Sequence, residues 1–230
     1  MPSGSSITML LMLALLQSIE LPAQWRSPRL TRLGPEEGIS STINAMAQDS
    51  VGFMYFATID GLYKYDGHTF RFFGHDPMDD NSIGEGDVNA IHAARDGKVW
   101  MTLRFGGLNS YDPHTDLFQR YPVPTLSFRS NPGAHGLYED QNKILWVGAD
   151  HFRLLSFDRS TTQFTSYTPS WIDAEKHGGR LMIMSIVGDK HNASLLWLSV
   201  LGYGHQDAPH PSYGLVSFNT STKVLLRKEG

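Results

Sequence analysis

The 230-residue chain contains no cysteine, which excludes a disulfide framework and cysteine-ligated metal sites. Charged residues are also scarce, at 18%, and their near balance leaves a net charge of −4. A chain without a basic excess is not expected to bind nucleic acid or an anionic membrane surface. Hydrophobic residues nevertheless make up 40%, so we expect a packed core rather than general disorder. The composition is compatible with small-molecule, carbohydrate and protein ligands.

Sequence motifs for catalysis or cofactor binding are also missing. The chain has no glycine-rich phosphate loop, no Gly-x-Ser-x-Gly elbow and no His-Glu-x-x-His motif. The acidic cluster of Asp76, Asp79 and Asp80 lacks the glycine and the terminal glutamate of a calcium loop, so we expect a solvated loop there. His205 and His210 flank a proline-rich insertion, but isolated loop histidines seldom bind a metal. We therefore expect no catalytic residue, no metal and no cofactor in residues 1–230.

One hydrophobic run lies near the N-terminus, where Ile7–Leu16 reads ITMLLMLALL. Its length is typical of a signal peptide and too short to span a bilayer. We predict that residues 1–23 are a signal peptide cleaved near Ala23, and that residues 24–230 form a periplasmic or otherwise extracytoplasmic domain. A buried or uncleaved N-terminal helix is the alternative. No other run has the roughly 18 apolar residues of a transmembrane helix, so a membrane anchor would lie in a downstream segment.

The chain contains four copies of one sequence pattern. They cover approximately residues 33–73, 83–121, 134–167 and 182–226, and the fourth carries an insertion. Equivalent aromatic positions, Tyr55, Trp100, Trp146 and Trp197, are separated by 45, 46 and 51 residues. A period of about 45 residues is typical of propellers or of helical arrays.

The apolar residues within each copy favour strands over helices. They come in short runs rich in aromatic and β-branched residues, with Gly, Asp and Asn between them. The repeated glycines would interrupt helices of 10 to 15 residues. Asp49–Gly52 and Asp96–Gly97 predict tight turns with positive φ. In the first copy we expect strands at residues 44–47, 53–58, 62–65 and 69–73. Four strands per copy predict an all-β β-propeller with about four blades.

The glycine, aspartate, threonine, aromatic and aliphatic residues of each copy recur at fixed spacings, which together form one sequence pattern. The first copy matches it at Gly38-Ile39-Ser40, Ile43, Met46, Asp49, Gly52, Tyr55, Thr58, Gly61-Leu62, Tyr65-Asp66, Thr69 and Phe70. The second copy matches at Val88, Ile91, Asp96-Gly97, Trp100, Thr102, Gly107-Leu108, Tyr111-Asp112, Thr115 and Phe118. This pattern resembles the two-component-regulator propeller repeat. The resemblance extends from about Leu33 to Leu226, although the third copy has Ala149 and Leu154-Leu155 where the pattern has Thr and Gly-Leu.

The resemblance implies an N-terminal extracytoplasmic sensor domain of a bacterial signalling protein anchored in the inner membrane. Such proteins are sensor histidine kinases, which act in a phosphorelay, or diguanylate cyclases, and their ligands are often carbohydrate-derived. Kinase or cyclase activity would belong to a longer parent, and residues 1–230 are not expected to be an enzyme. The family closes seven blades, so we expect this chain to be part of a seven-bladed ring; a free-standing four-bladed ring is the alternative. We also expect Pro28–Leu33 to supply an outer strand to the last blade.

Propellers gather loops from several blades on one face, where a ligand can bind. Aspartate, arginine and aromatic side chains in such loops offer a sugar both hydrogen bonds and a stacking face. From the loops after the second strands and between blades, we predict ligand contacts by Asp60, Arg104, Asp150, His151, Trp171 and His205. The expected partners are a small-molecule or carbohydrate ligand and a second subunit in a signalling dimer, without nucleic acid. A periplasmic protein-interaction platform and a secreted lyase or glycosidase are the alternative functions.

Overall fold

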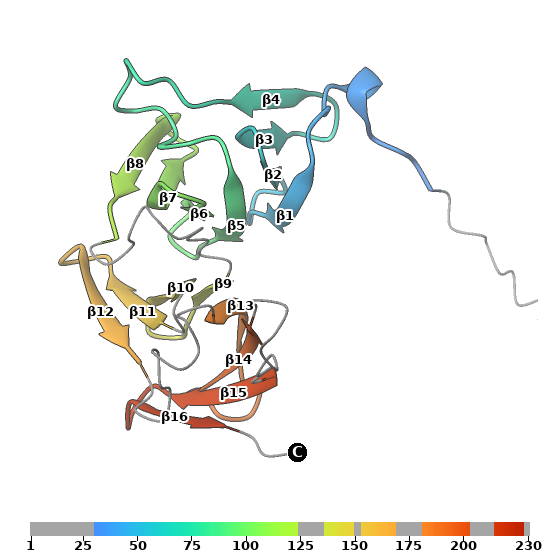
Figure 1. The fold of residues 1–230 in the computed structure, drawn as a ribbon. Helices are drawn as coiled ribbons and strands as arrows, with labels where there is room; N and C mark the ends of the chain where they lie inside the picture. The colour runs from blue at the N-terminus through green and yellow to red at the C-terminus, as the bar shows by residue number, and fades with distance from the viewer. Residues whose placement is uncertain (1–29, 124–135, 150–152, 169–180, 203–213, 228–230) are drawn as a thin grey trace, which may run out of the picture. The chain divides into compact units, whose positions relative to one another are not determined.

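The computed structural model describes residues 30–123, 136–149, 153–168, 181–202 and 214–227. The chain divides into two units, residues 1–32 and residues 33–230, and the second holds all of the secondary structure described below. Apart from a short 3₁₀ turn, η1 (Pro35–Glu37), the described secondary structure is all β (Figure 1). No helix among these residues is long and apolar enough to cross a membrane. The predicted signal peptide, residues 1–23, lies outside the described residues.

The strands form four antiparallel sheets of four strands each, and the strands of each sheet follow one another in chain order. The first sheet holds β1 (Ile43–Gln48), β2 (Met54–Thr58), β3 (Leu62–Tyr65) and β4 (Phe70–Phe73). The second holds β5 (Val88–Ala93), β6 (Val99–Leu103), β7 (Gly107–Asp112) and β8 (Leu117–Tyr121). The third holds β9 (Gly136–Glu139), β10 (Leu145–Ala149), β11 (Arg153–Asp158) and β12 (Gln163–Tyr167). The fourth holds β13 (Leu181–Gly188), β14 (Leu195–Gly202), β15 (Gly214–Asn219) and β16 (Val224–Arg227).

These sheets confirm the all-β propeller fold with four four-stranded blades. The strands of the first blade match the predicted ones to within one residue at each end. Gly52 and Gly97 have φ values of 110° and 84°, as expected for the tight turns, because glycine has no Cβ to oppose a left-handed backbone. Residues 30–33 form no strand in the described part of the chain, and the pairing of Pro28–Leu33 with the last blade of the ring stays a prediction.

Consecutive sheets pack through aromatic side chains at repeated positions. An aromatic residue on the second strand of one sheet and another on its fourth strand contact an aromatic residue on the third strand of the next sheet. At the first interface Tyr55 and Phe73 lie 6.1 and 4.9 Å from Tyr111, measured between ring centroids. At the second, Trp100 and Tyr121 lie 5.5 and 4.9 Å from Phe157. At the third, Trp146 and Tyr167 both lie 5.2 Å from Phe218. We call the side of a sheet that carries the second-strand and fourth-strand aromatic residues its donating face. The opposite side, which carries the third-strand aromatic residue, is its receiving face.

An aspartate in the first turn of a blade binds the second-strand aromatic residue. The Asp140 carboxylate accepts hydrogen bonds from the backbone N–H groups of Asn142 and Ile144 and, at 2.9 Å, from Trp146 Nε1. Asp189 accepts from Trp197 Nε1 at 2.8 Å in the last blade, and Asp49 accepts from the Tyr55 hydroxyl at 3.0 Å in the first. One carboxylate therefore shapes the turn and also satisfies a polar atom within the blade interface.

The second blade departs from this arrangement. Ala94 occupies the position of the aspartate, and Trp100 Nε1 is buried without a hydrogen-bond partner among the described residues. The ring of Trp100 instead stacks against Tyr121, and the Arg159 guanidinium lies 5.5 Å above it. Aromatic and cation–π contacts replace the aspartate here.

We expect Asp140→Ala to lower the free energy of unfolding by about 2–3 kcal/mol, because it leaves a buried indole N–H and the turn amides without an acceptor. Asp96→Ala is the matched control: Asp96 lies in the equivalent turn of the second blade and pairs with Arg159 at a partly exposed position. Its removal should cost at most about 1 kcal/mol. Urea denaturation of the two variants would measure the difference, and equal losses would contradict the role assigned to Asp140.

A buried carboxylate links the second and third blades. Glu139, at the end of β9, is almost completely buried and receives hydrogen bonds from the Arg159 guanidinium and from the Arg95 backbone N–H. His92 Nε2 lies 3.5 Å from the same carboxylate. Burial disfavours the charged form of Glu139, but the Arg159 and Arg95 hydrogen bonds outweigh it and hold the pKa below its usual value of 4.5. Burial also lowers the pKa of His92, which favours the neutral imidazole.

A carboxylate with a lowered pKa stabilises the fold above its unfolded pKa and loses that contribution as the pH falls through the folded pKa. The unfolding free energy of the wild type should therefore decrease as the pH falls below 4.5, and Glu139→Gln should show a smaller decrease over the same range. Chemical denaturation between pH 7 and pH 3 measures both, with the exposed Glu36→Gln as control. If the unfolding free energies of Glu139→Gln and the wild type depend on pH in the same way, the ionisation of Glu139 does not contribute to stability.

Candidate ligand-binding site

A group of polar side chains gathers where the first strands of the first two blades begin. Asn44 is the extra residue of a β-bulge in β1, between Ile43 and Ala45, and bulges commonly re-aim a side chain. Its amide Nδ2 donates to the Val88 carbonyl at 2.9 Å and to Asp87 Oδ1 at 3.3 Å. The side chain of the first blade thus reaches the start of the first strand of the second blade.

Arg104 and Phe105, in the loop between β6 and β7, complete this group. Arg104 Nη1 donates to Asp87 Oδ2 at 3.1 Å, and its backbone N–H donates to the Asp87 carbonyl at 2.9 Å. The Phe105 ring lies 5.4 Å from the guanidinium and is 40% exposed. The Phe105 backbone N–H donates to the Glu85 carboxylate at 2.7 Å. The arrangement combines an exposed aromatic ring with a guanidinium, an amide and two carboxylates.

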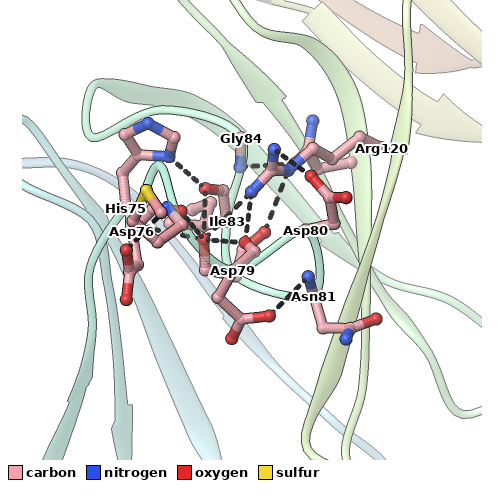
Figure 2. A network of polar contacts seen from close by, with 11 residues as sticks. His75, Asp76, Asp79, Asp80, Asn81, Ile83, Gly84 and Arg120 are labelled. Carbon is pink, nitrogen blue, oxygen red and sulfur yellow. Dashed lines mark hydrogen bonds and ion pairs between the residues drawn. The ribbon is translucent and has the colours of Figure 1, made fainter.

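The segment that carries Glu85 and Asp87 is the end of the long loop between β4 and β5, and Arg120 of β8 holds this loop (Figure 2). The Arg120 guanidinium donates to the carbonyls of Asp79 and Ser82 at 2.8 and 3.1 Å and to the Ser82 hydroxyl at 3.0 Å. His75 Nδ1 lies 2.7 Å from the Ile83 carbonyl. The loop is therefore tied to the outer strand of the second blade.

The acidic cluster in this loop shapes its turns. Asp76 Oδ1 accepts from the Met78 N–H, and Asp79 Oδ1 accepts from the Asn81 N–H, as aspartates do in tight turns. All three aspartates of the cluster are exposed, and Asp80 lies 3.8 Å from Arg120 in an ion pair. Among the described residues, no three histidine, aspartate or glutamate side chains could together hold a metal ion.

A buried amide joins the loop to the site. Asn109 Oδ1 accepts from the Gly84 N–H at 2.9 Å, and Asn109 Nδ2 donates to the Gly106 carbonyl at 3.2 Å. A Cβ at Gly84 would lie only 3.0 Å from Asn109 Oδ1, so the close approach favours glycine. Asn109 therefore sets the distance between the loop before β5 and the loop that carries Arg104 and Phe105.

Two of the predicted contact residues, Asp60 and Arg104, lie in the described part of the chain. Asp60 is exposed, and a Cβ on Gly86 would lie 3.2 Å from its carbonyl oxygen. The structure thus brings the Asp60 loop and Arg104 to the same segment, Glu85–Asp87. Asp150, His151, Trp171 and His205 lie outside the described residues, so their ligand contacts, like those of Asp60 and Arg104, stay predictions.

Asn44, Asp87 and Phe105 are not among the ligand contacts that the sequence predicts. The sequence does carry a signal for Asn44: an asparagine recurs at residue 89, the same position of the second copy, where most neighbours are small or apolar. In the structure both asparagines are the extra residue of a bulge in a first strand. Asp87 and Phe105 carried no comparable pattern, because their proximity to Asn44 and Glu85 arises from the packing of the two blades.

Arg120→Lys should loosen the loop without unfolding the protein, because one ammonium group cannot reproduce the several bonds of a planar guanidinium. We expect amide hydrogen exchange in residues 79–84 and at Phe118, whose N–H bonds the Asn81 carbonyl, to accelerate by about tenfold, since about 1.4 kcal/mol of local stability is lost. Arg71→Lys, at an exposed ion pair with Asp116, is the control and should leave this exchange unchanged. Unaltered protection in Arg120→Lys would show that the loop does not depend on Arg120.

No family model matches the chain. A 67-residue stretch is 37% identical to Histidine kinase P4 of Formosa agariphila, which corresponds to 29% of this chain and 5% of that protein. The extracellular domain of the putative hybrid two component system BT3049 from B. thetaiotaomicron superposes with a TM-score of 0.66 and 24% identity. That match covers 88% of this chain and 27% of the other.

Two further solved structures are similar to the chain. The extracellular domain of the putative one component system BT4673 from B. thetaiotaomicron has a TM-score of 0.64 and 20% identity, over 86% of this chain and 24% of that one. Virginiamycin B lyase from Staphylococcus aureus has a TM-score of 0.60 and 13% identity, over 87% of this chain and 58% of that one. The chain spans about a quarter of the two extracellular domains. These similarities show the propeller fold, which hosts both signalling domains and an enzyme.

Proposed function

We propose that the chain is an extracytoplasmic ligand-binding sensor domain of a bacterial two-component-type signalling protein. The observation that supports this most is its similarity to the extracellular domain of the putative hybrid two component system BT3049, over 88% of the chain. The matching stretch of a histidine kinase points in the same direction. Export through residues 1–23 would place the domain outside the cytoplasm, and the kinase or cyclase output would belong to a longer parent.

The group around Arg104 is suited to a carbohydrate-derived ligand. Sugar hydroxyl groups both donate and accept hydrogen bonds, so they match a set with an amide, carboxylates and a guanidinium. The apolar face of a sugar ring can pack on an aromatic side chain, and Phe105 offers an exposed ring beside the guanidinium. Because the Asp87–Arg104 ion pair and the Arg120-bound loop already hold these groups, little ordering is needed on binding.

The carboxylates of the site support binding rather than catalysis. Asp87 is engaged by Arg104 and Asn44, and Glu85 is engaged by the Phe105 amide. A general acid of a glycosidase needs a free position beside the scissile bond, whereas both of these carboxylates are engaged within the chain. Hydrolysis of a polysaccharide by the purified chain, abolished by replacing Asp87 or Glu85, would overturn the assignment of a non-catalytic domain.

Titration calorimetry against a panel of neutral and uronic-acid-containing oligosaccharides tests the proposal. We expect at least one to bind with a dissociation constant below about 1 mM, equivalent to about −4 kcal/mol. Arg104→Ala and Phe105→Ala should each weaken that binding at least tenfold, because they remove the hydrogen-bonding and the stacking group. Leu117→Ala, at an exposed position at the start of β8 in the same blade, is the control and should bind as the wild type does. Equal affinity in all four proteins would place the ligand elsewhere.

A further inference from the structure

A cavity of about 360 Å³ lies between the second and third blades, at the outer strands of both sheets. Its walls come from the end of β8 and from the beginning of β12 with the turn before it. The lining residues are Gln119, Arg120, Tyr121, Pro122, Thr162, Gln163 and Phe164. We call this cavity the rim pocket. It shares no residue with the group around Arg104, and its volume falls within the roughly 300–1,000 Å³ of small-molecule sites.

The packing between the two blades holds the aromatic part of the rim pocket in place. Tyr121, on the donating face of the second sheet, lies 4.9 Å from Phe157, measured between ring centroids. Phe164, on the receiving face of the third sheet, lies 4.7 Å from the same ring. Both Tyr121 and Phe164 are only partly buried. The pocket therefore offers apolar ring surface that needs little ordering on binding.

Gln119 supplies a carboxamide beside these rings. It is exposed and lies two residues before Tyr121 on β8, so both side chains point to the same face of the sheet. A carboxamide donates and accepts hydrogen bonds and carries no charge. Thr162 and Gln163, which are also exposed, add a hydroxyl and a second carboxamide to the lining. The polar part of the pocket thus matches a ligand whose groups both donate and accept.

The charges around the rim pocket favour a neutral ligand. Among its seven lining residues only Arg120 is charged. Its guanidinium already binds the carbonyls of Asp79 and Ser82 and the Ser82 hydroxyl, in the loop before β5. Neighbouring residues on a strand point to opposite faces, so Arg120 turns to this loop while Gln119 and Tyr121 face the third blade. A charged ligand in the pocket would lose hydration without gaining a free counter-charge.

The edge of β8 favours a small ligand over an extended peptide. An added strand needs a run of free N–H and C=O groups along the edge of a sheet. Alternate residues of an edge strand point these groups outward. The Phe118 N–H already donates to the Asn81 carbonyl at 2.9 Å, and Pro122, four residues later, has no N–H. Only Arg120 lies between them on this side of the strand, which is too short a run for strand addition.

We propose that the rim pocket is a second binding site, separate from the group around Arg104, and that it takes a neutral saccharide unit. The hydroxyl groups of a sugar exchange hydrogen bonds with the Gln119 carboxamide, and the apolar face of its ring packs on Phe164. The site lies between two consecutive blades and is formed by residues of both.

Nuclear magnetic resonance of the ¹⁵N-labelled full chain tests this site directly. The probes are neutral mono- and disaccharides of glucose, galactose, mannose and xylose, with glucuronate and galacturonate as charged counterparts. We expect at least one neutral sugar to shift the amide signals of residues 119–121 and 162–164 in a saturable way, with a dissociation constant below about 10 mM. Gln119→Ala and Phe164→Leu should each weaken this binding about fivefold, since one removes a hydrogen-bonding group and the other an aromatic ring.

Matched controls separate the rim pocket from general sugar contacts and from the group around Arg104. Gln141→Ala replaces an exposed glutamine between β9 and β10 and should bind as the wild type does. Phe105→Ala should leave the signals of the rim pocket and their response to sugar unchanged, so failure at one site is distinguishable from failure at the other. The proposal is overturned if no neutral sugar shifts the signals of the rim pocket. It is equally overturned if the uronates bind there as tightly as their neutral counterparts, or if Gln119→Ala and Phe164→Leu both bind like the wild type.

Discussion

The packing of aromatic side chains between consecutive sheets is the interaction on which the rest of this structure depends. A four-stranded sheet has two faces, and packing against a neighbouring sheet removes the apolar side chains of a face from water. At each interface two aromatic rings of one sheet enclose one ring of the next, as Trp146 and Tyr167 do with Phe218. Such rings bury a large apolar area and also prefer defined edge and stacked geometries. They therefore determine both the cohesion and the relative register of neighbouring sheets.

The polar interactions in the interfaces follow from this packing. A buried indole or phenol needs a partner for its N–H or O–H group, and Asp140, Asp189 and Asp49 provide it from the adjacent turn. Where Ala94 removes that carboxylate, Arg159 approaches the ring of Trp100 and also pairs with the buried Glu139. The second and third blades are thus joined by charges at the place where the aspartate is missing.

The candidate site is a consequence of how the first two blades pack. Arg120 fixes the loop between them, and Asn109 sets the separation between Gly84 and the loop of Arg104. These contacts bring Asn44, Asp87 and Arg104 together, although they are far apart in the sequence. The candidate site is therefore built across two blades and does not exist within either one alone.

The sequence by itself determined the repeat, the four strands of each blade and the turns. The reason is that these features are local: glycines at Gly52 and Gly97 and alternating aromatic runs act within a few residues of one another. It also indicated that Arg104 lies in the loop after the second strand of its blade, because strand order places that loop. Only the tertiary structure decided that Asn44 turns toward Asp87 at a bulge, that Trp100 has no carboxylate partner among the described residues, and that Glu139 is buried among cations. Those outcomes depend on contacts between blades, and no local pattern encodes the distance between residues that meet only after the sheets have packed.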